Sequence, residues 1–290
     1  MSYSFTISGF SDEIDSNVVK QFEHLNKLGI SYFEPRGIDG KNIADLDDGE
    51  VLALKEKMDQ YGIKVSSIGS PIGKISINDP MEPHMEKLAR VIKTAKMLDT
   101  KYIRVFSFFI PEGEDPANYK EEVLSRMKQM VALAEKEGVV LLHENEKGIY
   151  GDIASRCKDI FEAVKSPALG CVFDPANFVQ CGQTVYPDGF QLLKPYLTYM
   201  HIKDAKQDGT LLLPLFGYDG YRAQVDGQNV EVALNQAQNN RLEIHLSAGT
   251  RGTLRVRFAG KTWWRLTDAV SLLTLIGLFM ERRKERKKHV

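Results

Sequence analysis

The sequence predicts an α/β protein whose main part is a (β/α)8 TIM-type barrel with a missing or irregular eighth unit, followed by a small antiparallel β module and a C-terminal helix. Seven short runs rich in β-branched and aromatic residues recur at intervals of 27 to 37 residues. Helix-period segments lie between most of these runs, and regular alternation of strand and helix is typical of a parallel sheet. Beyond residue 205 the apolar residues recur with a period of two, which indicates antiparallel hairpins.

The seven runs are the predicted barrel strands, and they begin near Ser4, Ser31, Val65, Tyr102, Val139, Leu169 and Leu197. The predicted helices cover residues 18–28, 49–61, 81–98, 118–137 and 153–164. Gly29, Gly62 and Gly138 each follow one of these helices, as expected of glycines that end a helix. Seven such units predict the barrel over residues 1–205. An open doubly wound sheet is the alternative, but no Gly-rich phosphate-binding sequence follows the first strand.

The last third of the chain has a different organisation. Residues 206–220 contain Pro214 and three glycines without a helical period, and we interpret them as a junction. The period-two runs predict a β-rich module over residues 221–260, with strands at 221–225, 230–234, 242–246 and 254–258. Residues 263–290 combine an apolar helix with a basic tail. This segment fits either a helix that associates with a membrane or an amphipathic or packed terminal helix.

The charge and cysteine content of the sequence exclude some classes of function. Residues 1–210 carry 25 Lys and Arg against 32 Asp and Glu, and this acidic balance argues against nucleic acid as a partner, because phosphate backbones are bound by clustered cations. Three cysteines are too few for a disulfide framework, and the first ten residues lack the pattern of a secretory signal. We therefore expect a cytoplasmic protein.

Metal-ligand residue types end three successive predicted strands. Glu144 ends the fifth, Asp174 the sixth and His201 the seventh. The C-terminal ends of barrel strands form the active site of this fold, so the three side chains are expected to converge there. Carboxylate and imidazole suit a divalent cation such as Mn²⁺, Zn²⁺, Mg²⁺ or Co²⁺. The alternative is that each residue caps a helix or satisfies a loop.

Five short motifs carry a family resemblance. The motifs are Gly9-Phe10-Ser11-Asp12-Glu13-Ile14, Phe33-Glu34-Pro35-Arg36-Gly37, Leu142-His143-Glu144-Asn145-Glu146, Val172-Phe173-Asp174-Pro175-Ala176-Asn177 and His201-Ile202-Lys203-Asp204-Ala205. Because they occur in this order and at these intervals, residues 1–205 resemble the sugar phosphate isomerase/epimerase family, which has a xylose isomerase-like TIM barrel.

The resemblance implies a metal-dependent isomerase or epimerase that moves a proton through an ene-diolate of a sugar or sugar phosphate. In this family a glutamate, an aspartate and a histidine at the ends of strands five, six and seven bind the metal, and they correspond to Glu144, Asp174 and His201. Glu144 is then both ligand and general base. The candidate substrate-binding residues are Glu34, Arg36, His143 and Lys203, each of which is also interpretable as an ordinary loop or strand-end residue.

The sequence departs from the family pattern at the eighth strand. The family places a further glutamate there, whereas the nearest candidate segment has Val225, followed by Asp226 in a turn-like Asp-Gly. An alternative function is therefore a catalytically impaired barrel that acts as a binding or membrane-tethered protein. A DNA-repair endonuclease on the same barrel is a weaker alternative, since the chain has only six histidines.

Residues 211–290 bear a second and weaker resemblance. The segments 221–227, 246–249 and 256–258, followed by an apolar helix with a basic end, are similar to the C-terminal part of YfhO-type bacterial membrane proteins. In those proteins a small β-rich module precedes a last transmembrane helix. This resemblance implies membrane association through residues 263–290.

Overall fold

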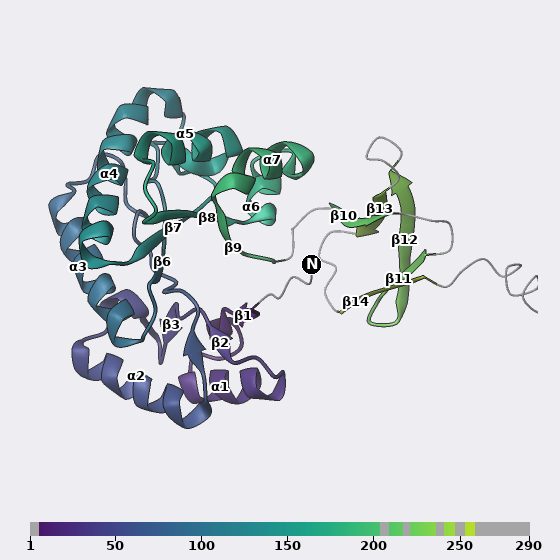
Figure 1. Ribbon diagram of the computed structural model, residues 1–290, viewed down its shortest axis with the longest axis horizontal. Coiled ribbons are helices and arrows are strands. Elements are labelled where there is room, and N and C mark those ends of the chain that lie inside the picture. The colour runs from purple at the N-terminus through teal and green to yellow at the C-terminus, as the bar shows by residue number, and fades with distance from the viewer. Residues whose placement is uncertain (1–5, 204–208, 217–220, 236–240, 247–252, 259–290) are drawn as a thin grey trace, which may run out of the picture. The chain divides into compact units, whose positions relative to one another are not determined.

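Seven short parallel strands form the inner layer of the N-terminal unit (Figure 1). The structure is a computed structural model that describes residues 6–203, 209–216, 221–235, 241–246 and 253–258. The seven strands are β1 (Ser8–Gly9), β2 (Tyr32–Phe33), β5 (Lys64–Val65), β6 (Tyr102–Val105), β7 (Val140–Glu144), β8 (Leu169–Phe173) and β9 (Leu197–Met200). Each lies where the sequence predicts a strand.

The strands are arranged in chain order. One sheet has the order β1-β2-β5 and the other β6-β7-β8-β9, with parallel pairing throughout. Ile68 joins the two sheets, because it forms a parallel bridge with Ile103 of β6 and its backbone bonds to Tyr102 and Arg104. This is the strand order of a TIM barrel. The two outer edges belong to β1 and β9, and no eighth parallel strand pairs with either in the described part of the chain.

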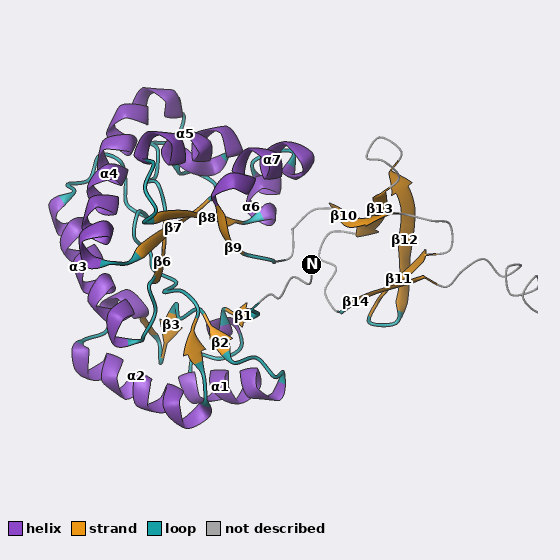
Figure 2. Cartoon of the chain, viewed as in Figure 1, coloured by secondary structure: helices purple, strands orange, loops and turns teal. Residues whose placement is uncertain are grey.

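Helices cover the outer face of these strands (Figure 2). They are α1 (Val18–Lys27), α2 (Asp48–Tyr61), α3 (Glu82–Met97), α4 (Lys120–Glu137), α5 (Ala154–Val164), and the short α6 (Pro175–Gln180) and α7 (Phe190–Leu193). A hairpin of β3 (Gly37–Ile38) and β4 (Lys41–Asn42) follows β2. The five helices predicted from periodicity are confirmed to within two residues at each end.

Local sequence explains where the helices start and stop. Asp47 and Glu50 form a capping box at the start of α2, in which each side chain accepts a hydrogen bond from the other's backbone N–H. Gly62 and Gly138 end α2 and α4 with φ of 65° and 71°, a left-handed conformation that glycine adopts without steric cost. The predicted helix ends are therefore confirmed.

The core lies between the strands and the helices. Fully buried side chains from both layers fill it, among them Phe22, Phe33, Leu88, Ile103 and Met127. Burial of such side chains is the main stabilising contribution to the fold. On the inner side, hydroxyl groups also link three strands, since Ser66 bonds to Ser8 of β1 at 2.6 Å and Tyr199 of β9 donates to Ser66 at 2.9 Å.

The C-terminal part forms a separate antiparallel sheet with the order β10-β13-β12-β11-β14. Its strands are β10 (Gly209–Phe216), β11 (Tyr221–Val225), β12 (Gln228–Asn235), β13 (Arg241–Leu246) and β14 (Leu254–Phe258). The predicted hairpins are confirmed. The predicted junction over residues 206–220 needs correction, because β10 pairs with β13 and is part of the sheet. Backbone contacts divide the chain into Met1–Lys203 and Asp204–Val290.

Two further predictions concern this part of the chain. Val225 belongs to β11, which pairs antiparallel with β12 and β14, so the segment around it is no eighth barrel strand. The predicted apolar helix and basic tail at 263–290 lie outside the described residues. Among the helices that the structure describes, none is long and apolar enough to cross a membrane.

Candidate metal centre

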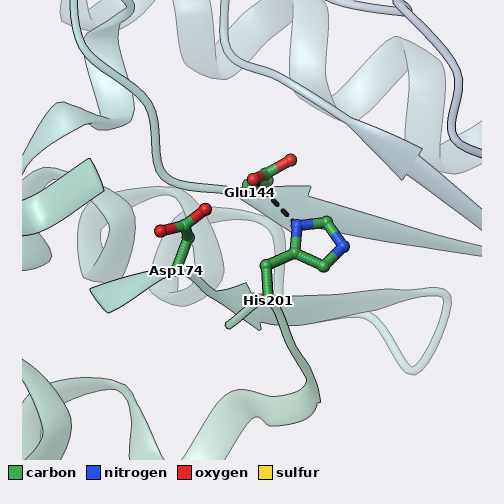
Figure 3. A group of neighbouring side chains, drawn as sticks. All are labelled: Glu144, Asp174 and His201. Carbon is green, nitrogen blue, oxygen red and sulfur yellow. Dashed lines mark hydrogen bonds and ion pairs between the residues drawn. The ribbon is translucent and has the colours of Figure 1, made fainter. Parts of the chain in front are cut away.

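Glu144, Asp174 and His201 converge at the C-terminal ends of three neighbouring strands (Figure 3). Glu144 is the last residue of β7, Asp174 directly follows β8, and His201 directly follows β9. One ligand atom from each residue lies within 4.8 Å of the other two. All three side chains are buried, with 3%, 0% and 6% of their surface exposed, respectively.

The parallel register brings these residues to one edge of the sheet. Glu144 pairs with Val172, two positions before Asp174, and Phe173 pairs with Met200, the residue before His201. Because successive side chains of a strand point to opposite faces, Glu144 and its neighbour His143 cannot face the same side. Glu144 turns into the barrel, whereas His143 packs against Phe161 of α5 in the helical layer.

Asp174 is fixed by the first turn of α6. Its Oδ1 accepts a hydrogen bond from the backbone N–H of Asn177 at 2.9 Å, which is an N-cap interaction. Asn145 exchanges two hydrogen bonds of 2.9 Å with the backbone of Asp174, and Asn177 donates to the backbone oxygen of Asn145 at 2.8 Å. The two asparagines therefore hold the ends of β7 and β8 together and aim the carboxylate.

His201 lies between two carboxylates. Its Nδ1 is 2.8 Å from Oε1 of Glu144, the contact drawn in Figure 3, and its Nε2 is 3.0 Å from Oε2 of Glu34. Glu34 directly follows β2 and is buried, so it reaches the imidazole from the other sheet of the barrel. The edge of Phe10 contacts the imidazole ring, with 4.8 Å between the ring centroids.

A buried arginine completes the cluster. Arg104 of β6 places Nη1 3.3 Å from Oε2 of Glu144 and Nε 3.9 Å from Oε1 of Glu34. Its guanidinium lies 5.2 Å and 5.1 Å from the ring centroids of Phe10 and Phe106, and it donates to the backbone oxygen of Gly69. Removal of several carboxylates from water requires compensating positive charge, which Arg104 supplies.

These contacts set the protonation states. Burial alone raises the pKa of Glu144, but the hydrogen bond from His201 and the charge of Arg104 outweigh it and bring the pKa to about 2. Burial lowers the pKa of His201, and the hydrogen bonds to Glu144 and Glu34 outweigh it and raise the pKa to about 9. The pKa of Asp174 is raised, mainly by burial, against the opposing effect of Lys203.

The donor set fits a divalent cation. Oε2 of Glu144 and Oδ2 of Asp174 are buried oxygen atoms that form ion pairs with Arg104 and Lys203 and have no other hydrogen-bond partner among the described residues. Buried carboxylate oxygens normally accept hydrogen bonds, and a bound cation is one partner that would satisfy such atoms. Together with an imidazole nitrogen they match the ligand preferences of Mn²⁺, Zn²⁺, Mg²⁺ or Co²⁺.

The four predicted substrate-binding residues lie in four different settings. Lys203 is at the centre, where its ammonium group is 2.9 Å from Oδ2 of Asp174 and donates to Oδ1 of Asn177 at 2.8 Å. Glu34 is buried behind His201. Arg36 stacks on Phe10 and forms ion pairs with Asp12 and Glu13, on the chain just after β1. His143 is not brought to the group, because it lies between β7 and α5 and neither ring nitrogen has a hydrogen-bond partner.

Arg104 was not predicted as a site residue from the sequence, and neither were Asn145, Asn177 or Phe10. A signal for Arg104 was present, since it is the one charged residue within the run Tyr102-Ile103-Arg104-Val105-Phe106. A charged side chain inside a buried strand is paired. Its partners could not be identified, because they lie 70 and 40 residues away along the chain.

Several solved structures have a similar fold. A xylose isomerase-like TIM barrel protein from Mycobacterium smegmatis in complex with magnesium has a TM-score of 0.56 and 16% identity, over 82% of this chain and 79% of that one. The IOLI protein with a bound zinc atom has a TM-score of 0.57 and 18% identity, over 69% and 73%. The 3-keto-D-glucoside 4-epimerase YcjR from E. coli has a TM-score of 0.51 and 15% identity, over 65% and 74%.

No curated protein matches this sequence. A protein-family model does match, over residues 22–250, and it describes a xylose isomerase-like TIM barrel. This match extends into the β-rich segment and gives no support to the second resemblance, to YfhO-type membrane proteins. With most of its length matched by the family model and a barrel of seven parallel strands, the chain belongs to the xylose isomerase-like TIM barrel family.

Proposed function

We propose that this protein is a metal-dependent isomerase or epimerase that acts on a sugar or sugar phosphate by proton transfer through an ene-diolate. The observation that carries the proposal is the buried group of Glu144, Asp174 and His201 at adjacent strand ends, with one ligand atom from each residue within 4.8 Å of the other two. The C-terminal ends of the strands are where enzymes of this fold place their chemistry. Sugar epimerases among the structures of similar fold support the substrate class.

Glu144, Asp174 and His201 are the residues that would hold the metal. Structures of similar fold contain magnesium and zinc, which supports a divalent ion without distinguishing among Mn²⁺, Zn²⁺, Mg²⁺ and Co²⁺. A divalent ion in this position supplies a Lewis acid that polarises a carbonyl and stabilises negative charge on its oxygen.

The chain's own residues have distinct roles in this proposal. Glu144 remains ionised at neutral pH and accepts the proton from the carbon next to the carbonyl group. Its low pKa is better matched to the role of ligand than to that of base, so the carboxylate is expected to be a weak base in need of an acidified substrate proton. The asparagine pair behind Asp174 keeps that carboxylate in place during turnover.

Two cations are available for substrate oxygens. Lys203 has 47% of its side chain exposed, and Arg36 has 36%, so both reach solvent, and Lys203 does so beside the buried carboxylate of Asp174. An ammonium or guanidinium group in this setting binds a hydroxyl or phosphate group by charge-assisted hydrogen bonds. His143 has no substrate-binding role in this proposal, because it packs against Phe161 in the helical layer.

Proton exchange tests this proposal directly. The chain, loaded with Mn²⁺, Mg²⁺, Zn²⁺ or Co²⁺, is incubated in D2O with a panel of ketoses, aldoses and their phosphates, and NMR follows deuterium at the carbon next to the carbonyl. We expect exchange with at least one substrate class and its loss in Glu144→Gln. Exchange that persists unchanged in Glu144→Gln would reject Glu144 as the base, and no exchange on the whole panel would reject the reaction.

One observation favours a second function. The segment around Val225, where the family supplies a further carboxylate, lies in the antiparallel sheet. A barrel without that carboxylate could bind a sugar without converting it. Saturable sugar binding by calorimetry, in the absence of any proton exchange, is the result that this alternative predicts.

For the compartment we propose the cytoplasm. Cys157, Cys171 and Cys181 are all free, and burial raises the pKa of each thiol, so that all three remain protonated. Free thiols are typical of a reducing compartment. Fractionation of the native host with a thiol-trapping reagent tests this proposal.

A further inference from the structure

Glu34 is too deeply buried to be an ordinary substrate contact. Only 2% of its surface is exposed, although it directly follows a strand that ends at the mouth of the barrel. Its Oε2 lies 3.0 Å from Nε2 of His201, on the opposite side of the imidazole from Glu144. A buried carboxylate that forms a hydrogen bond with a metal-binding imidazole fixes the tautomer and the orientation of that ring.

An imidazole that binds a metal must present a lone pair to it. A neutral histidine carries one N–H and one lone pair, and the hydrogen bond made by one nitrogen decides the state of the other. A carboxylate at Nε2 holds the N–H there, since it can only accept. Without a metal, Nδ1 also carries an N–H, because it faces the carboxylate of Glu144. A cation bound by Glu144, Asp174 and His201 would replace that proton and use the Nδ1 lone pair, while Glu34 keeps the N–H at Nε2.

Glu34 is itself held in place. Arg104 lies between the carboxylates of Glu34 and Glu144, with 3.9 Å from Nε to Oε1 of Glu34 and 3.3 Å from Nη1 to Oε2 of Glu144. The guanidinium is fixed in turn by the backbone oxygen of Gly69, at 3.2 Å from Nη2. One buried cation therefore lies between the two carboxylates that approach His201 from opposite sides, and its charge attracts both.

We propose that Glu34 is a positioning residue for the metal centre: it fixes His201 with Nε2 protonated and Nδ1 directed toward Glu144 and Asp174, and Arg104 holds Glu34 in that position. This inference rests on the proposed function, because it requires a metal at Glu144, Asp174 and His201. It assigns Glu34 a role that differs from the substrate contact expected from the sequence. Arg104 is a positioning residue too, and it acts on His201 through Glu34.

The affinity for Zn²⁺ tests this inference without any substrate. Zinc dissociation constants are measured by competition with a chromophoric chelator for the wild-type chain, Glu34→Gln, Glu34→Leu and Glu146→Gln. Glu146 is the matched control, because it is a glutamate just after β7, pairs with Lys74 and forms no hydrogen bond with His201 in the described part of the chain. Circular dichroism checks that each variant is folded.

We expect Glu34→Gln to weaken zinc binding by about 10-fold and Glu34→Leu by about 100-fold, the range found when the partner of a metal-binding histidine is lost. Glu146→Gln should stay within about threefold of wild type. If wild type binds zinc and Glu34→Gln binds it equally well, the inference is overturned while the metal site stands. If wild type binds no zinc, the proposed function itself fails and the inference with it.

A measurement on the wild-type chain covers the case in which the variants do not fold. In the zinc-loaded protein, two-dimensional ¹H–¹⁵N NMR of His201 should show a protonated Nε2 and a metal-shifted Nδ1. A protonated Nδ1, or a metal shift on Nε2, contradicts the proposed role of Glu34.

Discussion

Lys203 places its ammonium group 2.9 Å from Oδ2 of Asp174, the carboxylate oxygen that receives no hydrogen bond from the rest of the described chain. This cation therefore lies beside the atom that a metal would use. Half of its side chain is exposed, so it can move into solvent at little cost. Lys203 and a divalent ion therefore compete for the same carboxylate, and Lys203 is also placed to contact a substrate.

Substitution of Lys203 by methionine is expected to have two opposite effects. Metal binding should tighten by about three- to tenfold, because a like charge next to the ligand set is removed. The KM for a phosphorylated sugar should rise, because a cation at the mouth of the site is lost. Calorimetric titration with Zn²⁺ and steady-state kinetics measure the two effects, with Lys147→Met, an exposed lysine in the loop after β7, as the control. Weaker metal binding in Lys203→Met would contradict the competition.

Arg104 is expected to contribute strongly to stability. The variant Arg104→Met leaves Glu34 and Glu144 buried without their cation, and breaking a buried ion pair costs about 3–5 kcal/mol of unfolding free energy. Arg36→Met is the comparison, since its ion pairs with Asp12 and Glu13 are partly exposed and such pairs contribute about 1 kcal/mol or less. Denaturant unfolding at pH 7 measures both. Equal losses in the two variants would show that Arg104 is not the essential cation of the cluster.

Gly73 is required by the barrel for a steric reason. It adopts a φ of 88°, and a Cβ at this position would lie 2.0 Å from the backbone oxygen of Phe106. Gly73→Ala is expected to cost about 3 kcal/mol or more, because backbone strain and a backbone clash add up. Gly29→Ala is the matched control, with a φ of 70° and no atom within 4 Å of the added Cβ, and should cost only about 1 kcal/mol. Thermal unfolding of both variants tests the difference.

His84 gives the fold a specific dependence on pH. Its Nε2 accepts a hydrogen bond from the backbone N–H of Gly73 at 2.7 Å, which requires a neutral ring. Burial, together with the charges of Lys87 and Arg126, lowers the pKa of His84 from 6.5 to about 4. The unfolded chain therefore binds a proton that the folded chain excludes, and this contribution to stability is complete above pH 6.5 and is lost as the pH falls toward 4.

The variant His84→Gln isolates this effect. Its amide oxygen can still accept the hydrogen bond from Gly73, but it has no proton to gain. We expect the unfolding free energy of His84→Gln to fall less between pH 7.5 and pH 5 than that of wild type. Parallel curves for the two proteins would contradict the assignment.

Much of the barrel was predictable because its signals are local. The period of α4, the capping sequence of α2 and the glycines at positions 62 and 138 act within a few residues, and the structure confirms them. The convergence of Glu144, Asp174 and His201 was also predictable, because parallel strands end at the same edge. β10 was missed, because Pro214 and the surrounding glycines give it the composition of a loop.

The electrostatics of the site depend on contacts that the sequence does not reveal. Glu34 and His201 are 167 positions apart, and Arg104 lies between two carboxylates from other strands. Strand order indicates which residues share an edge but not which atoms touch. His143 was predicted to bind substrate, although strand alternation turns it away from the side that Glu144 faces.

The metal content of the purified chain tests the central claim most directly. The chain is loaded with Mn²⁺, Zn²⁺, Mg²⁺ or Co²⁺, desalted, and analysed by inductively coupled plasma mass spectrometry beside the triple variant Glu144→Gln, Asp174→Asn, His201→Ala, with circular dichroism as the check of folding. We expect about one ion per wild-type chain and none in the triple variant. A folded wild-type chain without metal, or equal metal in both proteins, would contradict the proposed site.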